Sequence, residues 1–256
     1  MSRRRVVVLL LTTGSWCCEP LFPQDATAAL EAAARQFLPN AGQWQPEVLF
    51  AARGDTALAA VTATGVELRL ARPADQPMLP LVLRWSRPCG EVVGEQAAGG
   101  AFAVFQGRDR SRWRSGLTGF GMVRCRAIAA GVDLRLRQAA AGFEYDLLLA
   151  PGADLTQVKL QVDGGLGMAL EADGRLRIDT AAGPLYQGIP ATWAELPDGS
   201  RQPVNCRFAV CAADRFGFEL EDRPAGRPIV IDPVPMPVSN AAMMLPNAAP
   251  RRAGST

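Results

Sequence analysis

The sequence predicts an all-β protein: an antiparallel β-sandwich, which can be arranged as two packed sandwich halves, with one short N-terminal α-helix. Short apolar runs recur through the chain between turn residues, and many alternate apolar with polar positions, as strands with one buried face do. The dipeptides Asp173-Gly174 and Asp198-Gly199 separate such runs and supply the positive φ angles that tight hairpin turns need. Of the 256 residues, 48% are hydrophobic, which is enough for a large core.

Residues 1–15 are expected to be an export leader. They combine a positively charged start, an apolar run from Val6 to Leu11, and small residues at Thr13 and Ser15. The apolar run is far shorter than the roughly 20 residues of a membrane-spanning helix, so no transmembrane span is expected. An ordinary arginine-rich N-terminus is the alternative. A leader would place the protein in the periplasm, at the cell surface or outside the cell.

Residues 16–36 are expected to form a short helical lead-in. Asp25 is a suitable N-cap, and Leu30, Ala33 and Phe37 recur at helical spacing before Pro39 ends the pattern. At the other end, residues 234–256 are rich in Pro and Ala without a period, which predicts a disordered tail.

Between these ends, residues 37–233 are expected to form the β-sandwich. Leu176 and Ile178 alternate with charged residues and should point inward, and Val204, Cys206, Phe208 and Val210 should share one face of a strand. A seam between the two halves is expected near Gly94–Gly107. The predicted strands are 48–50, 57–62, 66–70, 79–85, 101–105, 122–127, 132–136, 143–149, 158–162, 167–171, 176–180, 204–211, 216–220 and 229–231.

The stretch Gly131–Asp154 is expected to be the centre of the fold. Its two alternating runs, Val132–Leu136 and Phe143–Leu149, flank a Gly-bearing turn and so predict a β-hairpin. The sequence Pro151–Asp154 then predicts a sharp turn through which the chain leaves the sheet.

Charge and the lack of histidine restrict the classes of function. The formal net charge is +2, so no nucleic acid partner is expected. The chain has 0 histidines, which excludes Ser-His and Cys-His nucleophile pairs and imidazole ligands for metals. We therefore expect a protein that is not an enzyme and that has no cofactor.

Several motifs in order carry a family resemblance. Phe37–Gln43 reads Phe-x-x-Asn-x-Gly-Gln, and Gly107–Trp113 reads Gly-x-x-x-x-x-Trp. Further along the chain stand Met122–Cys125, Gly131–Leu134, Phe143–Asp146, Ala150–Asp154, Tyr186–Gln187 and Ile231–Pro233. Together they resemble a domain of uncharacterised function that precedes seven-bladed β-propeller (SBBP) repeats in bacterial secreted and cell-surface proteins. The resemblance implies fold and location and carries no catalytic residue.

The sequence departs from this family pattern at three places. Cys125 stands where the family more often has an aromatic residue, and Ala129-Ala130 replaces Tyr-Pro before the Gly-Val-Asp motif. No propeller repeat follows Ile231–Pro233 in this sequence. The last departure weakens a role as an adaptor for a propeller.

Glu144 and Asp146 are the only candidate catalytic pair. Two positions apart on a strand, their carboxylates would share a face at a spacing of roughly 7 Å, which lies between those of retaining and inverting glycosidases. The apolar residues around them predict the opposite face as the buried one, so a solvated, non-catalytic surface is the preferred interpretation.

Aspartates at turns and strand ends are weak candidates for calcium binding. The two best placed are Asp133 and Asp154, but no EF-hand spacing is present, and hydrogen bonding to the turn backbone is the simpler expectation. We expect no metal.

Arginines around one tryptophan form the candidate binding site. Arg108, Arg110, Arg112 and Arg114 bracket Trp113 in a polar loop, and this combination can hold a phosphate or an acidic glycan by ion pairing and stacking. A solvated loop that Trp113 anchors to the sandwich is the alternative.

Four cysteines lie in the predicted domain: Cys89, Cys125, Cys206 and Cys211. In an exported protein they allow three pairing schemes if all are oxidised. Cys206 and Cys211 would be about 16 Å apart on one strand and cannot bond each other without a bend. Buried free thiols are at least as well supported as disulfides.

The expected function is that of a non-enzymatic, exported β-sandwich module that binds or scaffolds an unknown protein or glycan at the bacterial cell surface or in the periplasm. Two alternatives stay open. One is a carboxylate-dependent, glycoside-type hydrolase that uses Glu144 and Asp146, which a deep acidic cleft would favour. The other is a degenerate remnant of a propeller-linked surface protein.

Overall fold

The computed structural model describes residues 6–7, 36–54, 57–72, 76–105, 107–139 and 142–233. Most of the expected leader, the expected helix before residue 36 and the expected tail therefore lie outside the described residues. Phe37, which completed the helical spacing, is the first residue of a strand instead, because its backbone pairs with that of Ala52. Within the described ranges, no helix is both long and apolar enough to cross a membrane.

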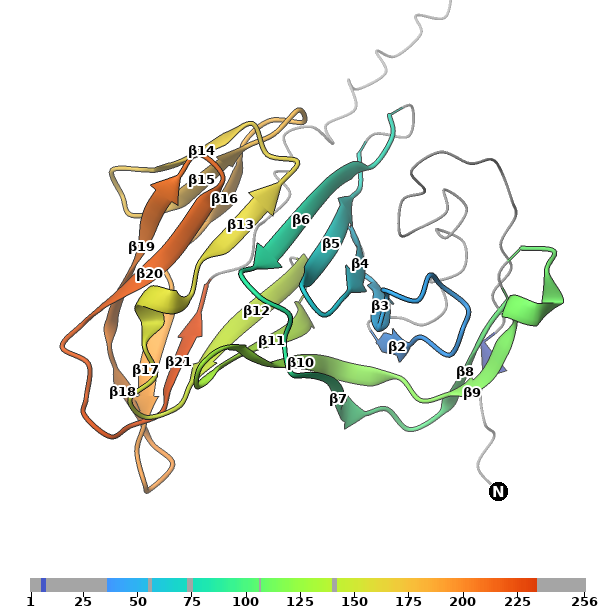
Figure 1. The fold of residues 1–256 in the computed structure, drawn as a ribbon, viewed down its shortest axis with the longest axis horizontal. Helices are drawn as coiled ribbons and strands as arrows, with labels where there is room; N and C mark the ends of the chain where they lie inside the picture. The colour runs from blue at the N-terminus through green and yellow to red at the C-terminus, as the bar shows by residue number, and fades with distance from the viewer. Residues whose placement is uncertain are drawn as a thin grey trace, which may run out of the picture.

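The protein is an all-β sandwich, as the sequence predicts (Figure 1). Every predicted strand coincides with or overlaps a strand in the structure. The strands are β1 (Val6–Val7), β2 (Phe37–Pro39), β3 (Phe50–Arg53), β4 (Ala57–Val61), β5 (Gly65–Leu70), β6 (Leu79–Trp85), β7 (Glu91–Ala97), β8 (Ala101–Val104), β9 (Arg114–Leu117), β10 (Phe120–Ala129), β11 (Val132–Ala139), β12 (Gly142–Leu149), β13 (Leu160–Asp163), β14 (Gly167–Leu170), β15 (Leu176–Asp179), β16 (Leu185–Gln187), β17 (Ala191–Glu195), β18 (Arg201–Pro203), β19 (Asn205–Ala212), β20 (Arg215–Glu221) and β21 (Ile229–Asp232).

Most strands belong to one 15-stranded sheet, which forms two long layers that are joined at one corner. Two further sheets have three strands each, in the orders β1-β8-β9 and β14-β15-β16. The first layer runs β2-β3-β4-β5-β6-β13-β20-β19, and the second runs β7-β10-β11-β12-β21-β17-β18. The layers join where Phe120 of β10 pairs with Phe37 of β2. The predicted Gly131–Asp154 hairpin is β11 and β12, which pair along their whole length in the middle of the second layer.

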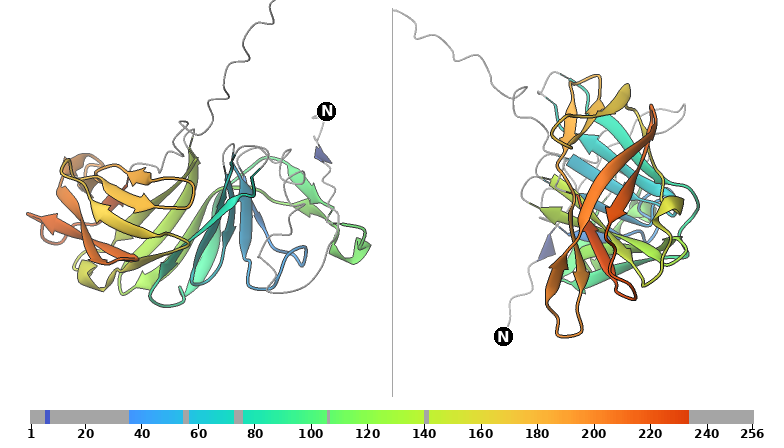
Figure 2. Two further views of the ribbon diagram at one scale, coloured as in Figure 1. Left: turned by 90° about the horizontal axis from the view of Figure 1, so that it is seen from above. Right: turned by 90° about the vertical axis from the view of Figure 1, so that its left-hand side faces the viewer.

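Both layers continue through two packed halves, which lie side by side in Figures 1 and 2. The halves are linked where β6 pairs with β13 and where β12 pairs with β21. The seam therefore does not lie near Gly94–Gly107. Gly94 is inside β7 and pairs with Val123, and its missing side chain leaves room for the Phe120 ring. The sequence suggests that Gly94 belongs to a linker, but the structure needs a glycine at this position for packing.

One large core fills the space between the layers, and the predicted alternation decides which residues enter it. A second, smaller hydrophobic cluster includes Leu38, Trp44 and Val48. Leu176 and Ile178 are fully buried, as predicted. Phe208 is also buried and contacts the ring of Phe216 at a centroid distance of 5.9 Å. Cys206, Phe208 and Val210 keep one register against β20, as residues of one strand face do, although Val210 is 39% exposed.

Candidate functional site

The candidate acid pair is not on a solvated surface. Glu144 and Asp146 lie on β12, on the face of the second layer turned away from the core, yet the Asp146 side chain is 0% exposed and that of Glu144 is 11% exposed. The sequence predicts this face to be open to water because its neighbours on the strand, such as Tyr145 and Leu147, fill the core. The prediction is wrong because arginine side chains of the neighbouring strand β11 cover the carboxylates.

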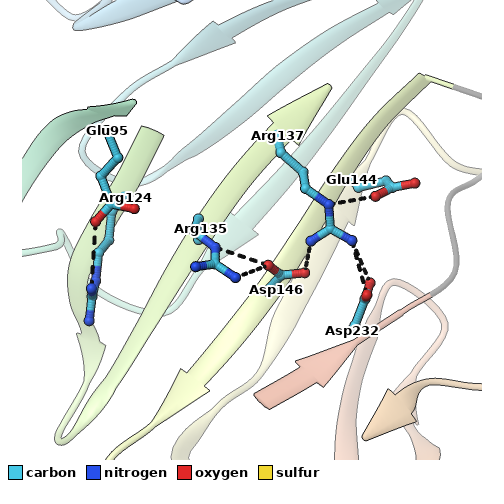
Figure 3. Close-up of polar contacts among 7 residues, drawn as sticks. All are labelled: Glu95, Arg124, Arg135, Arg137, Glu144, Asp146 and Asp232. Atoms are coloured by element: carbon cyan, nitrogen blue, oxygen red, sulfur yellow. Dashed lines mark hydrogen bonds and ion pairs between the residues drawn. The ribbon is translucent and has the colours of Figure 1, made fainter. Parts of the chain in front are cut away.

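Two arginines of β11 hold the Asp146 carboxylate (Figure 3). The Nε and Nη2 atoms of Arg135 donate to Asp146 Oδ2 at 3.0 and 2.7 Å, and Arg137 Nη1 donates to Oδ1. Arg135 lies directly opposite Asp146 in the β11–β12 ladder. The strand register therefore brings the charges together, and each oxygen of a buried carboxylate has a charged partner, as burial requires.

Arg137 also binds the two remaining acids of this group. Its Nε atom is 2.7 Å from Glu144 Oε2, and its Nη2 atom donates to both oxygens of Asp232 at 3.0 Å. Asp232 reaches this position because β21 pairs with β12. We call Arg135, Arg137, Glu144, Asp146 and Asp232 the buried ion cluster.

The same face carries further ion pairs on β7, β10 and β11. Arg124 lies 2.8 Å from Asp133 and 3.5 Å from Glu95, and Arg126 lies 2.8 Å from Glu91. Alternating charges thus cross the second layer from β7 to β21. Cross-strand pairs of opposite charge stabilise a sheet, so these charged residues have a structural role on this face.

Burial shifts the pKa values of two acids in the buried ion cluster. It raises the pKa of Glu144 and of Asp232 above their ordinary values, and the neighbouring carboxylates add to the rise while Arg137 opposes it. A raised pKa is what a general acid needs. Each of these carboxylates, however, is already paired with an arginine. The group is therefore better suited to holding neighbouring strands together than to reacting with a substrate.

The two calcium candidates take part in local structure. Asp133 accepts hydrogen bonds from Arg124 Nε at 2.8 Å and from the Ala127 amide at 2.7 Å, which supports the positive φ of 56° at Ala127. Asp154 caps a short 3₁₀ helix and accepts bonds from the amide and hydroxyl of Thr156. In the described ranges, no group of three or more Asp, Glu or Cys residues is arranged to hold a metal ion.

The arginine loop lies at the end of the molecule remote from β14–β20, between β8 and β9 (Figure 1). Arg108, Arg110 and Arg112 are exposed there. Trp113 is half-buried, packs edge-on against Phe105 with ring centroids 5.1 Å apart, and donates to the Gly107 carbonyl at 3.2 Å. These Trp113 contacts lie within the β8–β9 hairpin, so the predicted anchoring of the loop to the sandwich by Trp113 stays a prediction. The Arg110 guanidinium lies 5.2 Å from the Trp113 ring, a cation–π distance.

Arg114 differs from the other arginines of the loop, because it is a structural residue. It donates to the carbonyls of Ala41, Ser111 and Trp113, and so fastens the loop to the turn that follows β2. Two of the motifs that carry the family resemblance, Phe37–Gln43 and Gly107–Trp113, therefore meet in space.

The turn after β2 is held by two polar side chains of the Phe-x-x-Asn-x-Gly-Gln motif, to which the sequence analysis assigned no structural role. Asn40 donates to the carbonyls of Gln45 and Val48 at 2.9 and 2.7 Å. Gln43 is 0% exposed and donates to the Pro39 carbonyl at 2.7 Å. The Asn-Ala-Gly-Gln sequence was the available signal, since Asn and Gly favour tight turns.

The cysteines fall into three environments. Cys89 and Cys125 are both buried in the core. Cys206 is buried at another place in the core, where burial raises its pKa to about 11, and Cys211 is exposed at the end of β19. The expectation that Cys206 and Cys211 face opposite ways agrees with this burial.

Comparison with known proteins gives a family and no function. No curated protein and no solved structure matches the chain. A model of one family, described as a domain of unknown function (DUF7948), matches residues 37–234. This confirms the expectation of an uncharacterised domain, whereas the association with propeller repeats stays a prediction. The match covers most of the chain, which therefore belongs to the DUF7948 family of domains of unknown function.

Proposed function

We propose that this protein is an exported, non-enzymatic β-sandwich module that binds an anionic ligand of the bacterial cell envelope through its arginine loop. The observation that carries the proposal is the loop itself. It presents Arg108, Arg110 and Arg112 to solvent, while Trp113 packs against Phe105 at the end of β8 and Arg114 fastens the loop to the turn after β2. A charged surface on a fixed backbone loses little conformational entropy when it binds.

The chemistry of the loop favours a ligand that carries carboxylate, sulfate or phosphate groups. Guanidinium groups bind these anions with two parallel hydrogen bonds. Asp109 is tied to Ser111 through the amide and the hydroxyl at 2.9 and 2.7 Å, so its charge is partly used within the loop. An acidic envelope glycan or an anionic polymer fits this surface better than a neutral sugar.

A non-enzymatic role is supported by the state of the carboxylates. The chain has 0 histidines, and the only acid pair considered for catalysis is enclosed by Arg135 and Arg137. A hydrolase would need at least one of these acids to reach a substrate. The proposal includes residence beside β-propeller repeats in secreted proteins, for which the support is the resemblance of the ordered motifs.

The test is binding of the full chain to an array of acidic, sulfated and neutral envelope glycans and to anionic polymers. The variant Arg108→Ala/Arg110→Ala/Arg112→Ala should reduce binding by at least about tenfold, because each lost ion pair with a ligand costs on the order of 1 kcal/mol. A variant with the same change in net charge, Arg84→Ala/Arg175→Ala/Arg207→Ala, removes exposed arginines elsewhere and is the control.

Two results would contradict the proposal. Equal losses in both triple variants would mean that net charge, not the loop, attracts the ligand. Binding to none of the anionic probes would leave the remnant alternative. Raising the salt concentration should weaken binding to the loop, since exposed charges are screened within about 10 Å at 0.1 M salt.

A further inference from the structure

Asp109 is the acidic residue of the arginine loop, and only one oxygen of its carboxylate is used within the loop. Asp109 Oδ1 accepts hydrogen bonds from the Ser111 amide at 2.9 Å and from the Ser111 hydroxyl at 2.7 Å. Asp109 Oδ2 lies 3.9 Å from Arg112 Nε, which is too far for a hydrogen bond. Because the side chain of Asp109 is 57% exposed, the loop presents an acceptor oxygen to solvent beside its guanidinium groups.

The short turn of the loop fixes the position of this oxygen. Asp109 caps the 3₁₀ turn Arg110–Arg112 through Ser111, and at the other end of the turn the Trp113 amide donates to the Arg110 carbonyl at 3.1 Å. The Ser111 hydroxyl, as the main cause, lowers the pKa of Asp109, so this carboxylate is ionised at neutral pH. An ionised carboxylate accepts hydrogen bonds and donates none.

The remaining polar side chains of the loop are donors. The Trp113 indole N–H is already used, since it donates to the Gly107 carbonyl at 3.2 Å. The Arg110 guanidinium lies over the Trp113 ring, and Arg108 and Arg112 are exposed. The loop thus combines guanidinium donors with one charged acceptor in their midst.

These two kinds of group suit different parts of one ligand. Guanidinium groups bind carboxylates and sulfates, and a carboxylate accepts hydrogen bonds from hydroxyl groups. A polymer of uronic acid carries both a carboxylate and hydroxyl groups on its sugars. A linear polyphosphate has no hydroxyl donors along its chain, so a phosphate near Asp109 meets a like charge and makes no hydrogen bond with it. Two polymers of equal charge should therefore bind this loop differently.

We propose that Asp109 is a specificity-determining residue of the arginine loop, and that the ligand is an acidic polysaccharide with free hydroxyl groups beside its carboxylates. Asp109 Oδ2 accepts a hydrogen bond from a sugar hydroxyl while Arg108 and Arg112 bind carboxylates of the same chain. The same oxygen repels polyanions that lack hydroxyl donors, so it acts against the wrong ligands as well as for the right one. This inference rests on the proposed function, because it names the ligand class of the same loop.

The test measures binding of three probes to the full chain. The probes are a polyuronate with free hydroxyl groups, the same polyuronate with its hydroxyl groups acetylated, and a linear inorganic polyphosphate of matched net charge. All dissociation constants are measured at one salt concentration, since salt screens exposed charges. The wild type should bind the free polyuronate at least about threefold more tightly than either of the other two probes.

Asp109→Asn removes the charged acceptor and keeps the turn. The asparagine carbonyl still accepts hydrogen bonds from Ser111, while an NH2 donor takes the place of Oδ2. The preference for free polyuronate over polyphosphate, taken as the ratio of their dissociation constants, should fall by at least about threefold. The general gain in anion binding from the lost negative charge cancels in this ratio, because the two probes carry the same charge.

Asp154→Asn is the matched control for net charge. Asp154 also caps a 3₁₀ turn and accepts from the amide and the hydroxyl of the residue two positions on, Thr156, but it lies between β12 and β13. The substitution changes the net charge by the same amount as Asp109→Asn. The polyuronate preference of this variant should equal that of the wild type.

The outcomes separate this inference from the proposed function. An unchanged preference in Asp109→Asn, an equal fall in Asp154→Asn, or equal binding of the two polyuronates by the wild type would overturn the inference. The proposed function would survive each of these results if the triple arginine variant of the loop still lost binding. Binding of none of the three probes to the wild type would overturn both.

Discussion

Asp146 and Arg135 face each other on neighbouring strands, with Asp146 Oδ2 2.7 Å from Arg135 Nη2, and the aspartate is completely closed to solvent. A carboxylate in this position is stable only while its arginine partners neutralise it. Asp146, a catalytic candidate in the sequence, is therefore the central residue of a structural cluster. It also makes the contribution of that acid measurable.

Replacing Asp146 should destabilise the protein strongly. Asp146→Asn removes the carboxylate that Arg135 binds and one of the three carboxylates that Arg137 binds, which should lower the free energy of unfolding by about 3 kcal/mol. Glu219→Gln is the control, because Glu219 is 53% exposed and pairs with the 60% exposed Arg207. Its loss should stay within about 0.5 kcal/mol in urea unfolding. Losses of equal size would show that the buried ion cluster has no special role.

The pH dependence of stability should reveal the raised pKa of Asp232. Burial keeps this carboxyl protonated in the folded protein at a pH where the unfolded chain has already lost the proton. The folded state therefore binds more protons, and stability falls as pH rises from about 4, the ordinary aspartate value, through the raised pKa. The advantage of the wild type over Asp232→Asn should shrink over this window in urea unfolding.

Asp154→Asn is the control of opposite sign. The Thr156 hydroxyl, as the main cause, lowers the pKa of Asp154. Its contribution to stability is therefore present above about pH 4 and is lost as pH falls through the lowered pKa. If the two variants shifted in the same direction with pH, the assignment of the raised pKa to Asp232 would be wrong.

Tyr145 should contribute to stability through its hydroxyl. The Tyr145 Oη atom lies 3.3 Å from Gln187 Oε1, and both side chains are buried, so Tyr145→Phe leaves the amide oxygen of Gln187 without this donor. We expect a loss of about 1–2 kcal/mol in the free energy of unfolding. Tyr186→Phe on the adjacent strand position should cost less than about 0.5 kcal/mol, because the Tyr186 ring contact with Arg175 does not need the hydroxyl. The reverse order would contradict the assigned bond.

Gly42 should control the attachment of the arginine loop. Its φ is +100°, and a Cβ atom there would lie 2.5 Å from Arg114 Nη2, so Gly42→Ala should cost about 2 kcal/mol and displace Arg114. Limited trypsin digestion should then cut the loop at Arg110 and Arg112 faster. Gly99→Ala is the control, because a Cβ at Gly99 would meet no atom within 4 Å. An unchanged rate in Gly42→Ala would mean that Arg114 does not fasten the loop.

Several strands could not be predicted from the sequence, namely β1, β2, β7, β9, β16, β17 and β18. Most have three to five residues, and β18 includes Pro203. β7 is longer, but Gly94 and Glu95 interrupt its apolar run. These segments are extended because longer strands beside them provide hydrogen-bond partners, such as β10 for β7. The local sequence of such a segment carries no information about these hydrogen-bond partners.

The sequence by itself determined the all-β class, the β11–β12 hairpin and the inward direction of residues such as Leu176 and Ile178. These features depend on a side-chain period of two and on turn residues, and both are local. Only the tertiary structure decided that Asp232 reaches Arg137 from a distant part of the chain and that Asp146 is buried. Whether the second face of a strand meets water depends on which strands pair beside it and which side chains they extend over it. The exposure of that second face is therefore known only once the strands have been placed in the sheet.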